Sequence, residues 1–237
     1  MTRAAPLRMG LFGKIAARPD YVAHDAPRPF IAALEPWLHA GVAASRLALD
    51  RGWRSAFLAA PLWRFWLGGE ICGAPALGVM APSIDMNGRY FPLLAFAMAE
   101  GAEGIAPPEL VDQEAFLKAA EELLLGTLAP GAPFEAALAA LAALPRPKLA
   151  PLVAARAPAL ALRGGLMAPL DDTPPERLFA SLRRADWART YGAASFWHTR
   201  GGADFRPLAM ALSGLPDPSL FTLFLTGKSA GGAGAGM

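Results

Sequence analysis

The chain has 237 residues and a mass of 24.8 kDa; 54% of its residues are hydrophobic and 18% are charged. This composition is typical of a globular protein with a large core and excludes a disordered chain. The formal net charge of +2, without a stripe of Lys and Arg interleaved with aromatic residues, argues against nucleic-acid binding. The single cysteine, Cys72, excludes an internal disulfide and a cysteine-based metal site, and we expect it to be a buried apolar residue.

The N-terminus does not read as a signal peptide, because Arg3, Arg8 and Lys14 interrupt its first residues. No run approaches the roughly 18 consecutive apolar residues that a membrane span needs. We therefore expect a cytoplasmic protein that does not insert into a membrane. Its oligomeric state stays open at this level.

The first part of the chain combines strand and helix patterns. The expected elements are a strand at 7–12, a loop at 14–27, helices at 29–49 and 53–59, and a strand at 62–67. Gly13 ends the first strand, and Pro29 suits the first turn of the long helix. Pro36 falls inside that helix, so we expect a kink or a split there.

The most informative segment is a tight turn between two apolar runs. Asn87 and Gly88 form a strong hairpin signal, because both residues tolerate the positive φ that a primed turn requires. The expected strands span 75–85 and 90–99. The tip carries Asp85 and Arg89, which are close enough to pair, and such a pair either holds the turn together or presents polar groups to a partner.

The second part of the chain contains more helix than strand. The expected elements are helices at 113–128 and 133–144, a connecting segment at 145–158, a strand at 160–162, a helix at 173–189, a second hairpin with strands at 194–199 and 207–213, and a last helix at 217–227. Asp112 can cap the first of these helices, and Thr173 followed by two prolines and Glu176 is typical of a helix start. The Gly/Ala tail at 229–237 is expected to be disordered.

Two hairpins, an isolated first strand and about five helices do not give the strict alternation of a parallel doubly wound fold. We expect an α+β architecture, mainly an antiparallel sheet of five to six strands with helices packed on its faces. One domain should cover residues 1–228. Of the aromatic residues Trp37, Trp53, Trp63, Phe65 and Trp66, we expect most in the core and one or two facing outward.

No catalytic motif is complete. The segment around Lys228 lacks the earlier glycine of a phosphate-binding loop, and Ser83 does not lie in a nucleophile elbow. Ser195 and His198 are three residues apart on a strand, so their side chains point to opposite faces. We expect no catalytic residue, no cofactor, no metal and no enzyme activity.

Seven short motifs follow one another along the chain in a distinctive order. They are Gly10-Leu11-Phe12-Gly13-Lys14, Arg18-Pro19-Asp20-Tyr21-Val22, Pro61-Leu62-Trp63-Arg64-Phe65, Gly78-Val79-Met80-Ala81-Pro82-Ser83-Ile84-Asp85, Gly88-Arg89-Tyr90-Phe91-Pro92, Ser195-Phe196-Trp197-His198-Thr199 and Gly214-Leu215-Pro216-Asp217-Pro218. In this order they resemble the motifs of the TagF (ImpM) family of type VI secretion-associated proteins. Pro19 and His198 depart from the family pattern, which has Gly and Trp at these positions.

The resemblance implies a cytoplasmic accessory protein that represses type VI secretion after translation, by binding and sequestering the forkhead-associated scaffold protein of the system. The candidate residues for a partner-binding or structural polar cluster are Lys14, Arg18, Asp20, Ser83, Asp85, Arg89, Arg64 and Trp197. The alternative function is an anion- or phosphate-binding small-molecule enzyme or sensor, in which Lys14, Arg18 and Arg89 would hold the anion.

Overall fold

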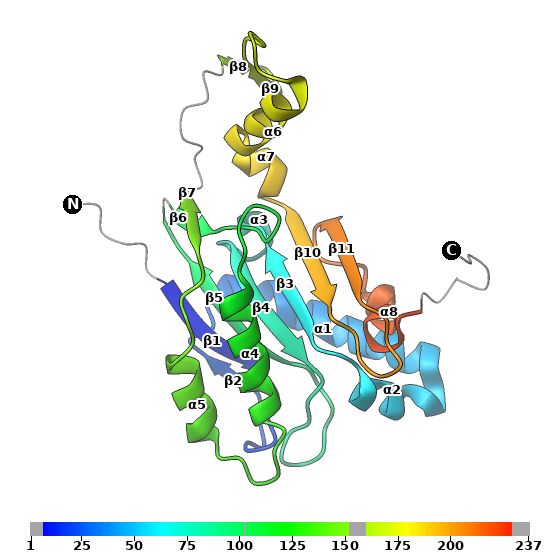
Figure 1. The fold of residues 1–237 in the computed structure, drawn as a ribbon. Helices are drawn as coiled ribbons and strands as arrows, with labels where there is room; N and C mark the ends of the chain where they lie inside the picture. Colours follow the sequence, from blue (N-terminus) through cyan, green and yellow to red (C-terminus); the bar gives the residue numbers. More distant parts are fainter. Residues whose placement is uncertain (1–6, 102, 152–159, 229–237) are drawn as a thin grey trace.

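The computed structural model describes residues 7–101, 103–151 and 160–228, and its centre is a seven-stranded antiparallel sheet (Figure 1). The strands are β1 (Leu7–Gly13), β2 (Val22–His24), β3 (Trp63–Leu67), β4 (Ala76–Ala81), β5 (Leu93–Ala99), β10 (Ala194–Thr199) and β11 (Leu208–Ser213). Their order across the sheet is β11-β10-β3-β4-β5-β1-β2. Strands from the two ends of the chain are therefore joined in one sheet.

One face of the sheet is covered by helix α1 (Arg28–Leu49), with α2 (Trp53–Ala59) and α8 (Phe221–Thr226) beside it. Figure 1 shows α1 behind the sheet. The core on this side is aromatic: the rings of Phe30 and Phe96 stack with their centroids 4.1 Å apart. The indole of Trp63 donates a hydrogen bond to the carbonyl of Phe224 at 2.9 Å, which ties the C-terminal helix to the sheet.

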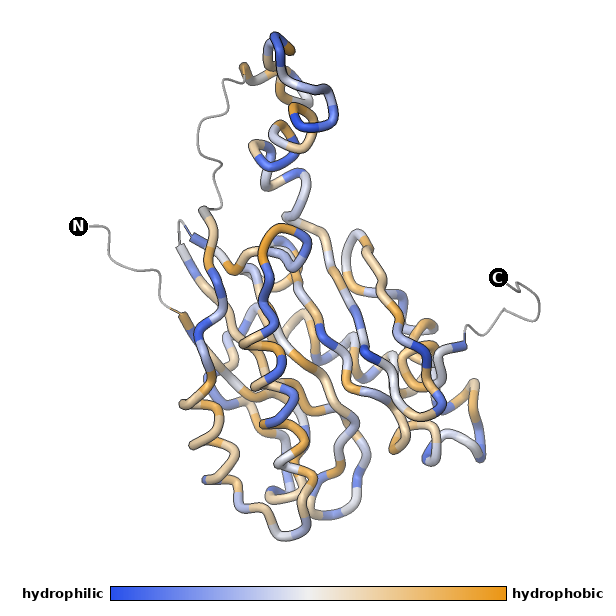
Figure 2. The backbone as a smooth tube through the Cα atoms, viewed as in Figure 1, coloured by the Kyte–Doolittle hydropathy of each residue, from blue (hydrophilic) through white to orange (hydrophobic). Residues whose placement is uncertain are grey.

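The opposite face is covered by α4 (Glu114–Gly126) and α5 (Phe134–Ala142), which Figure 1 shows in front of the sheet. The core here is mainly aliphatic, with Leu77 and Ala95 of the sheet packed beneath Phe116 and Leu124. In Figure 2 α5 is coloured mostly as hydrophobic, which fits its alanine-rich sequence. Helices on both faces bury β4 and β5 completely, so these strands are continuous apolar runs rather than alternating ones.

Shorter elements complete the fold. They are η1 (Asp50–Gly52), α3 (Gly69–Cys72), β6 (Glu103–Ile105), β7 (Leu149–Pro151), β8 (Leu160–Leu162), β9 (Gly165–Met167), α6 (Pro175–Ala185), α7 (Trp187–Tyr191) and η2 (Pro218–Leu220). Figure 1 shows β8, β9, α6 and α7 projecting beyond one end of the sheet. Strands β6 and β7 form one two-stranded sheet, and β8 and β9 form another.

The expected α+β class and most of its elements are confirmed. Both hairpins are present, since β4 pairs with β5 and β10 pairs with β11, each antiparallel. The sheet has seven strands instead of five or six, because residues 22–24, expected in a loop, pair with β1 as β2. Cys72 is buried as expected, and burial raises the pKa of its thiol to about 12.

The long helix α1 runs without a break through Pro36, so of the two expected outcomes the split does not occur and the kink stays a prediction. Two other expectations, about a later helix and the aromatic residues, are wrong. The expected helix at 173–189 is two helices that meet at Asp186, and Thr173 makes no side-chain cap. The expectation that one or two of the named aromatic residues face outward also fails. All five are buried: Trp37, Trp53, Trp63, Phe65 and Trp66.

The expectation of one domain over 1–228 stays a prediction, and the expected disorder of the tail at 229–237 falls outside the described residues. In the part of the chain that the structure describes, no helix is both long enough and apolar enough to cross a membrane.

Candidate functional site

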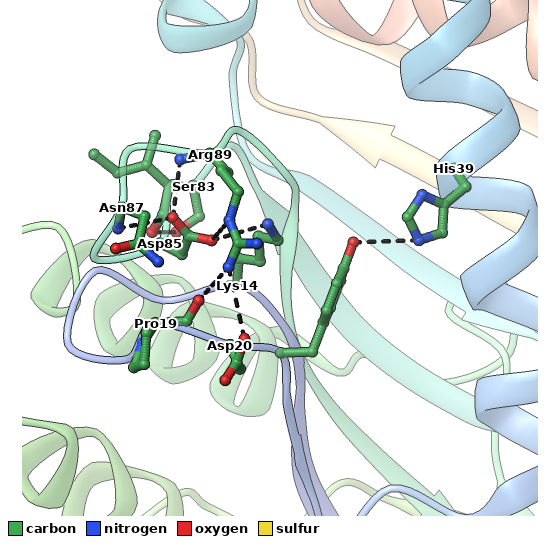
Figure 3. A network of polar contacts seen from close by, with 10 residues as sticks. Lys14, Pro19, Asp20, His39, Ser83, Asp85, Asn87 and Arg89 are labelled. Atoms are coloured by element: carbon green, nitrogen blue, oxygen red, sulfur yellow. Dashed lines mark hydrogen bonds and ion pairs between the residues drawn. The ribbon is translucent and has the colours of Figure 1, made fainter.

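A buried ion pair joins the end of the first strand to the tip of the β4–β5 hairpin. Lys14 follows β1 directly, and its Nζ lies 2.9 Å from Oδ2 of Asp85 (Figure 3). Lys14 is 5% exposed and Asp85 is 1% exposed. Two charges so far from water are tolerated only when they pair and their remaining hydrogen-bonding capacity is filled.

The hairpin tip fills the remaining capacity of Asp85. Oδ1 accepts the backbone N–H groups of Asn87 and Arg89, both at 2.9 Å, and Oδ2 accepts Nε of Arg89 at 2.6 Å. The N–H of Gly88 donates to the carbonyl of Asp85 at 2.9 Å, which closes the turn. The carboxylate therefore organises the backbone of the turn as well as the two cations.

The turn differs from the expected one in a single respect. Gly88 has a φ of +73°, but Asn87 is not among the residues with positive φ. Together with the hydrogen bond from Asp85 N–H to the Arg89 carbonyl, this is a three-residue loop in which only the last residue is left-handed. The expectation that both Asn87 and Gly88 adopt positive φ is wrong, because the side chain of Asp85 stabilises the longer loop.

Arg89 extends the network to the N-terminal loop. Its guanidinium donates to the carbonyl of Pro19 and lies 3.6 Å from the carboxylate of Asp20. The N–H of Met86 donates to the carbonyl of Arg18 at 3.0 Å. We call the side chains of Lys14, Asp20, Asp85 and Arg89, with these backbone groups, the Asp85 network; it fixes the N-terminal loop against the hairpin tip.

The electrostatics of Asp85 follow from its donors. Burial works against ionisation, yet the hydrogen bonds from Lys14 and from the backbone and side chain of Arg89 outweigh it. They hold the pKa of Asp85 well below its ordinary value. Asp85 is therefore ionised at neutral pH.

Tyr21 and His39 border the network, and no sequence pattern predicted that these two residues would meet. The Nζ of Lys14 lies 5.0 Å from the centre of the Tyr21 ring, and the Tyr21 hydroxyl lies 3.2 Å from Nε2 of His39. Burial, with the nearby carboxylate of Glu35, raises the pKa of Tyr21.

Two candidate residues lie beside the network without joining it through their side chains. The guanidinium of Arg18 points to α5, where it lies 3.6 Å from the carboxylate of Glu135 and 4.6 Å from the centre of the Phe134 ring. Ser83 is buried, and its carbonyl accepts the N–H of Phe91 at 3.1 Å. Its hydroxyl lies 3.5 Å from the carbonyl of the next residue.

Arg64 and Trp197 lie elsewhere in the fold. Arg64, on β3, forms a separate network beneath α4: its Nε lies 2.6 Å from Glu121, its Nη1 lies 2.6 Å from Glu114, and Arg200 also contacts Glu114. Trp197 belongs to the aromatic core on the α1 side. The structure therefore places four candidate residues in the Asp85 network, Arg64 in a second network and Trp197 in the core, and it leaves the side chains of Arg18 and Ser83 outside all three.

The hairpin tip borders an open depression of about 590 Å³. Met86 at the tip is 60% exposed and Leu128, in the loop after α4, is 45% exposed. Arg18 and Glu135 lie in the same lining. We call these four residues the tip surface; it combines exposed apolar side chains with one cation and one anion.

The chemistry of the Asp85 network is that of a closed set of ion pairs. Lys14 and Arg89 both donate to Asp85, and an incoming anion would have to replace that carboxylate to reach the buried ammonium of Lys14. Within the ranges that the structure describes, no three His, Cys, Asp or Glu side chains come together as metal ligands.

The chain is similar to known proteins in sequence and fold. The model of the TagF N-terminal domain, a type VI secretion system-associated family, matches residues 10–144. The crystal structure of PA0076 from Pseudomonas aeruginosa PAO1 is similar over 97% of each chain, with 33% sequence identity and a TM-score of 0.78. No curated protein matches the chain.

The matched region is more than half of the chain and contains all the candidate residues except Trp197. The α+β fold and the order of these motifs identify the chain as a type VI secretion-associated protein. The chain belongs to the TagF family of type VI secretion-associated proteins.

Proposed function

We propose that this protein is a non-catalytic, cytoplasmic repressor of type VI secretion that acts after translation by sequestering the forkhead-associated scaffold protein. Membership of a type VI secretion-associated family supports the link to the secretion system. The repressor role and the partner are what the motif resemblance implies for the family.

The observation that supports the proposal most directly is that the Asp85 network holds the hairpin tip in place against the N-terminal loop. Its cations are paired with Asp85, and its effect is to fix a hairpin tip whose Met86 side chain is 60% exposed. Met and Arg are enriched in protein–protein interfaces, and a rigid patch loses little conformational entropy on binding. The tip surface is therefore the binding face that we assign to the scaffold protein.

An anion-binding enzyme or sensor is the competing function. It would need Lys14, Arg18 and Arg89 to converge on a ligand, yet Lys14 is buried against Asp85 and Arg18 turns away to Glu135. We expect inorganic phosphate to give no binding heat in calorimetry with the purified protein. Binding at a one-to-one ratio that disappears in Lys14→Met would favour this competing function.

A matched pair of charge reversals tests the proposed binding face. Arg18 and Arg8 have side chains 49% and 50% exposed, and each forms one long ion pair with a glutamate, at 3.6 and 3.5 Å. Exposed ion pairs contribute little to stability, so Arg18→Glu and Arg8→Glu should both fold. Only Arg18 lies in the tip surface.

The measurement is binding of purified scaffold protein by calorimetry. Arg18→Glu should weaken the affinity at least tenfold, because it places two like charges on the binding face, and Arg8→Glu should bind like the unchanged protein. Equal affinities for the two variants would remove the tip surface from the interface. If the unchanged protein does not bind the scaffold protein at all, the scaffold protein is not its partner.

A further inference from the structure

Strand β11 is an edge of the main sheet with an open outer side. It pairs with β10 only, and it ends the strand order of the sheet. In the part of the chain that the structure describes, the backbone of Leu208–Ser213 makes no hydrogen bonds other than those to β10. In an antiparallel pair about half of the backbone groups point away from the partner, so this edge presents a row of free donors and acceptors.

The sequence of β11 lacks the features that normally protect such an edge. It has six residues, Leu-Ala-Met-Ala-Leu-Ser, with no charge, no proline and no bulge in its pairing with β10. The nearest charged residues along the chain are Arg206 and Asp217. The other edge strand, β2, has only three residues and is followed by Asp25. Edges of soluble proteins are usually short, charged or interrupted, so β11 is the exception in this sheet.

The two faces of β11 are distinct. Leu208, Met210 and Leu212 are half-buried against the aromatic core on the α1 side, whereas Ala209 and Ala211 are exposed on the opposite face. Read from either end, residues 208–212 have the same sequence, Leu-Ala-Met-Ala-Leu. A second copy of this strand, laid antiparallel beside it, would therefore meet large residues with large ones and alanine with alanine.

We propose that two copies of this protein associate through β11, antiparallel about a two-fold axis, to form one continuous sheet. The axis passes through Met210, so Leu208 of each copy lies opposite Leu212 of the other and Ala209 opposite Ala211. A two-fold axis normal to the sheet places the same face of both copies on the same side. Opposed residues must then both have even numbers or both have odd numbers, because side chains alternate between the two faces, and this register meets that condition. The pairing satisfies the free backbone groups and extends the apolar row on the α1 side.

The absence of charge along the strand permits a second copy to lie beside it. A homodimer with this register opposes no like charges along 207–214, because these residues carry none. The contact also leaves the tip surface free, since β11 ends the sheet on the side away from β1 and β5. Dimerisation is therefore compatible with binding of a partner at the tip.

The test is the molecular mass in solution, by sedimentation velocity over low to high micromolar concentrations. The unchanged chain should approach twice 24.8 kDa as concentration rises. The double variant Ala209→Lys/Ala211→Lys should stay monomeric, because the register places lysine opposite lysine twice. The variant Ala209→Glu/Ala211→Glu should stay monomeric for the same reason. An equimolar mixture of the two should restore the doubled mass, because unlike charges then oppose each other.

Far-UV circular dichroism tests whether each variant is folded. Recovery of the doubled mass in the mixture would show independently that both variants are folded. The double variant Ala142→Lys/Ala143→Lys, at two exposed positions near the end of α5, is the matched control and should leave the dimer intact. A monomer at every concentration would overturn the proposal. A dimer that survives in both charged variants, or a mixture that stays monomeric although folded, would overturn the β11 contact and this register.

Discussion

Asp85 shows how one carboxylate can fix two segments that are far apart in sequence. Four hydrogen bonds reach its side chain, from Lys14, from the backbone of Asn87 and from the backbone and side chain of Arg89. Because the carboxylate is shielded from water, these donors replace a hydration shell. Removing the charge leaves the ammonium of Lys14 buried without a counterion, which costs more than the loss of a surface pair.

The first prediction concerns the stability of this ion pair. Asp85→Asn keeps the shape of the side chain but leaves Lys14 unpaired, and it should lower the free energy of unfolding by about 3 kcal/mol. For a chain of this length that corresponds to a fall of roughly 6 to 12 °C in the thermal midpoint. Denaturant unfolding followed by tryptophan fluorescence measures the change. An unchanged midpoint would mean that the carboxylate contributes no stability.

The second prediction is the pH dependence of the same pair. The pKa of Asp85 is lower in the folded protein than its value of 3.8 in an unfolded chain. A lowered folded pKa gives stability that is fully present above the unfolded pKa and is lost as the pH falls toward the folded one. The unfolding free energies of the unchanged protein and Asp85→Asn should therefore differ by a constant amount above about pH 5 and converge below it. A gap that stays constant down to about pH 2 would contradict the assignment.

The third prediction concerns Arg64, whose guanidinium contacts Glu114 and Glu121 beneath α4. Arg64→Lys keeps the charge but cannot contact both carboxylates through a planar fork, so we expect a loss of about 2 kcal/mol in unfolding free energy. Arg200→Lys, at a position with a 63% exposed side chain in the same network, is the control and should cost under about 1 kcal/mol. Equal losses in urea unfolding would show that the buried fork gives no advantage.

The candidate residues differ in how far the sequence could place them. The pairing of Asp85 with Arg89 follows from a four-residue spacing around a turn. Lys14 is 71 residues from Asp85, so their contact depends on which strands are neighbours, and a spacing pattern does not contain that information. The buried face of β10 could not be inferred from its sequence, because Ser195 and Thr199 are buried on either side of Trp197 whereas Phe196 is only partly buried.

At the level of elements, the hairpin tip depends on one glycine. Gly88 has a φ of +73°, and apart from its two chain neighbours no residue has an atom within 4 Å of the position that its Cβ would take. Gly13 also has a positive φ, of +126°, but there the Cβ would lie 2.0 Å from the carbonyl oxygen of Pro92. The two positions separate the cost of backbone conformation from the cost of a steric clash.

The fourth prediction uses this contrast. Gly88→Ala should cost about 1 to 2 kcal/mol of unfolding free energy, the penalty of a left-handed backbone alone, and Gly88→Asn should cost less. Gly13→Ala should yield little folded protein, because the clash is with backbone. Thermal midpoints and soluble yields measure both effects. A Gly88→Ala variant as stable as the unchanged protein would show that the tip relaxes into another turn.

Most elements could be predicted from local patterns, and the exceptions have physical causes. Strand β2 has three residues and exists because β1 offers a free edge, which no local pattern reveals. Helix α1 continues through Pro36 because its buried residues, among them Leu34, Trp37 and Leu38, keep it packed on the sheet. The chain breaks at Asp186 between α6 and α7. The helical spacing of apolar residues continues across this break, so spacing alone predicts a single helix.

At the level of the whole molecule, the order of the strands in the sheet could not be predicted from the sequence. The α+β class follows from the sequence of expected elements, but β10 lies beside β3 although about 130 residues separate them. The pairing of β10 with β3 brings the C-terminal hairpin into the same sheet as the N-terminal motifs. It also leaves the β4–β5 tip and the β11 edge as two separate surfaces on one rigid sheet.

We propose that the protein represses type VI secretion by occupying a partner, without turnover. A sequestering protein acts by mass action, so its effect rises with its concentration relative to the partner. It removes an interaction and leaves the apparatus proteins themselves in place. Arg18→Glu should lose the effect and Arg8→Glu should keep it.

The most direct test is the amount of secreted tube protein in the medium of a host that overproduces this protein, beside immunoblots of the apparatus proteins in the cells. Secretion should fall as the protein accumulates, while the apparatus proteins stay at their normal levels. Secretion that is unchanged while the protein accumulates in soluble form would contradict the claim.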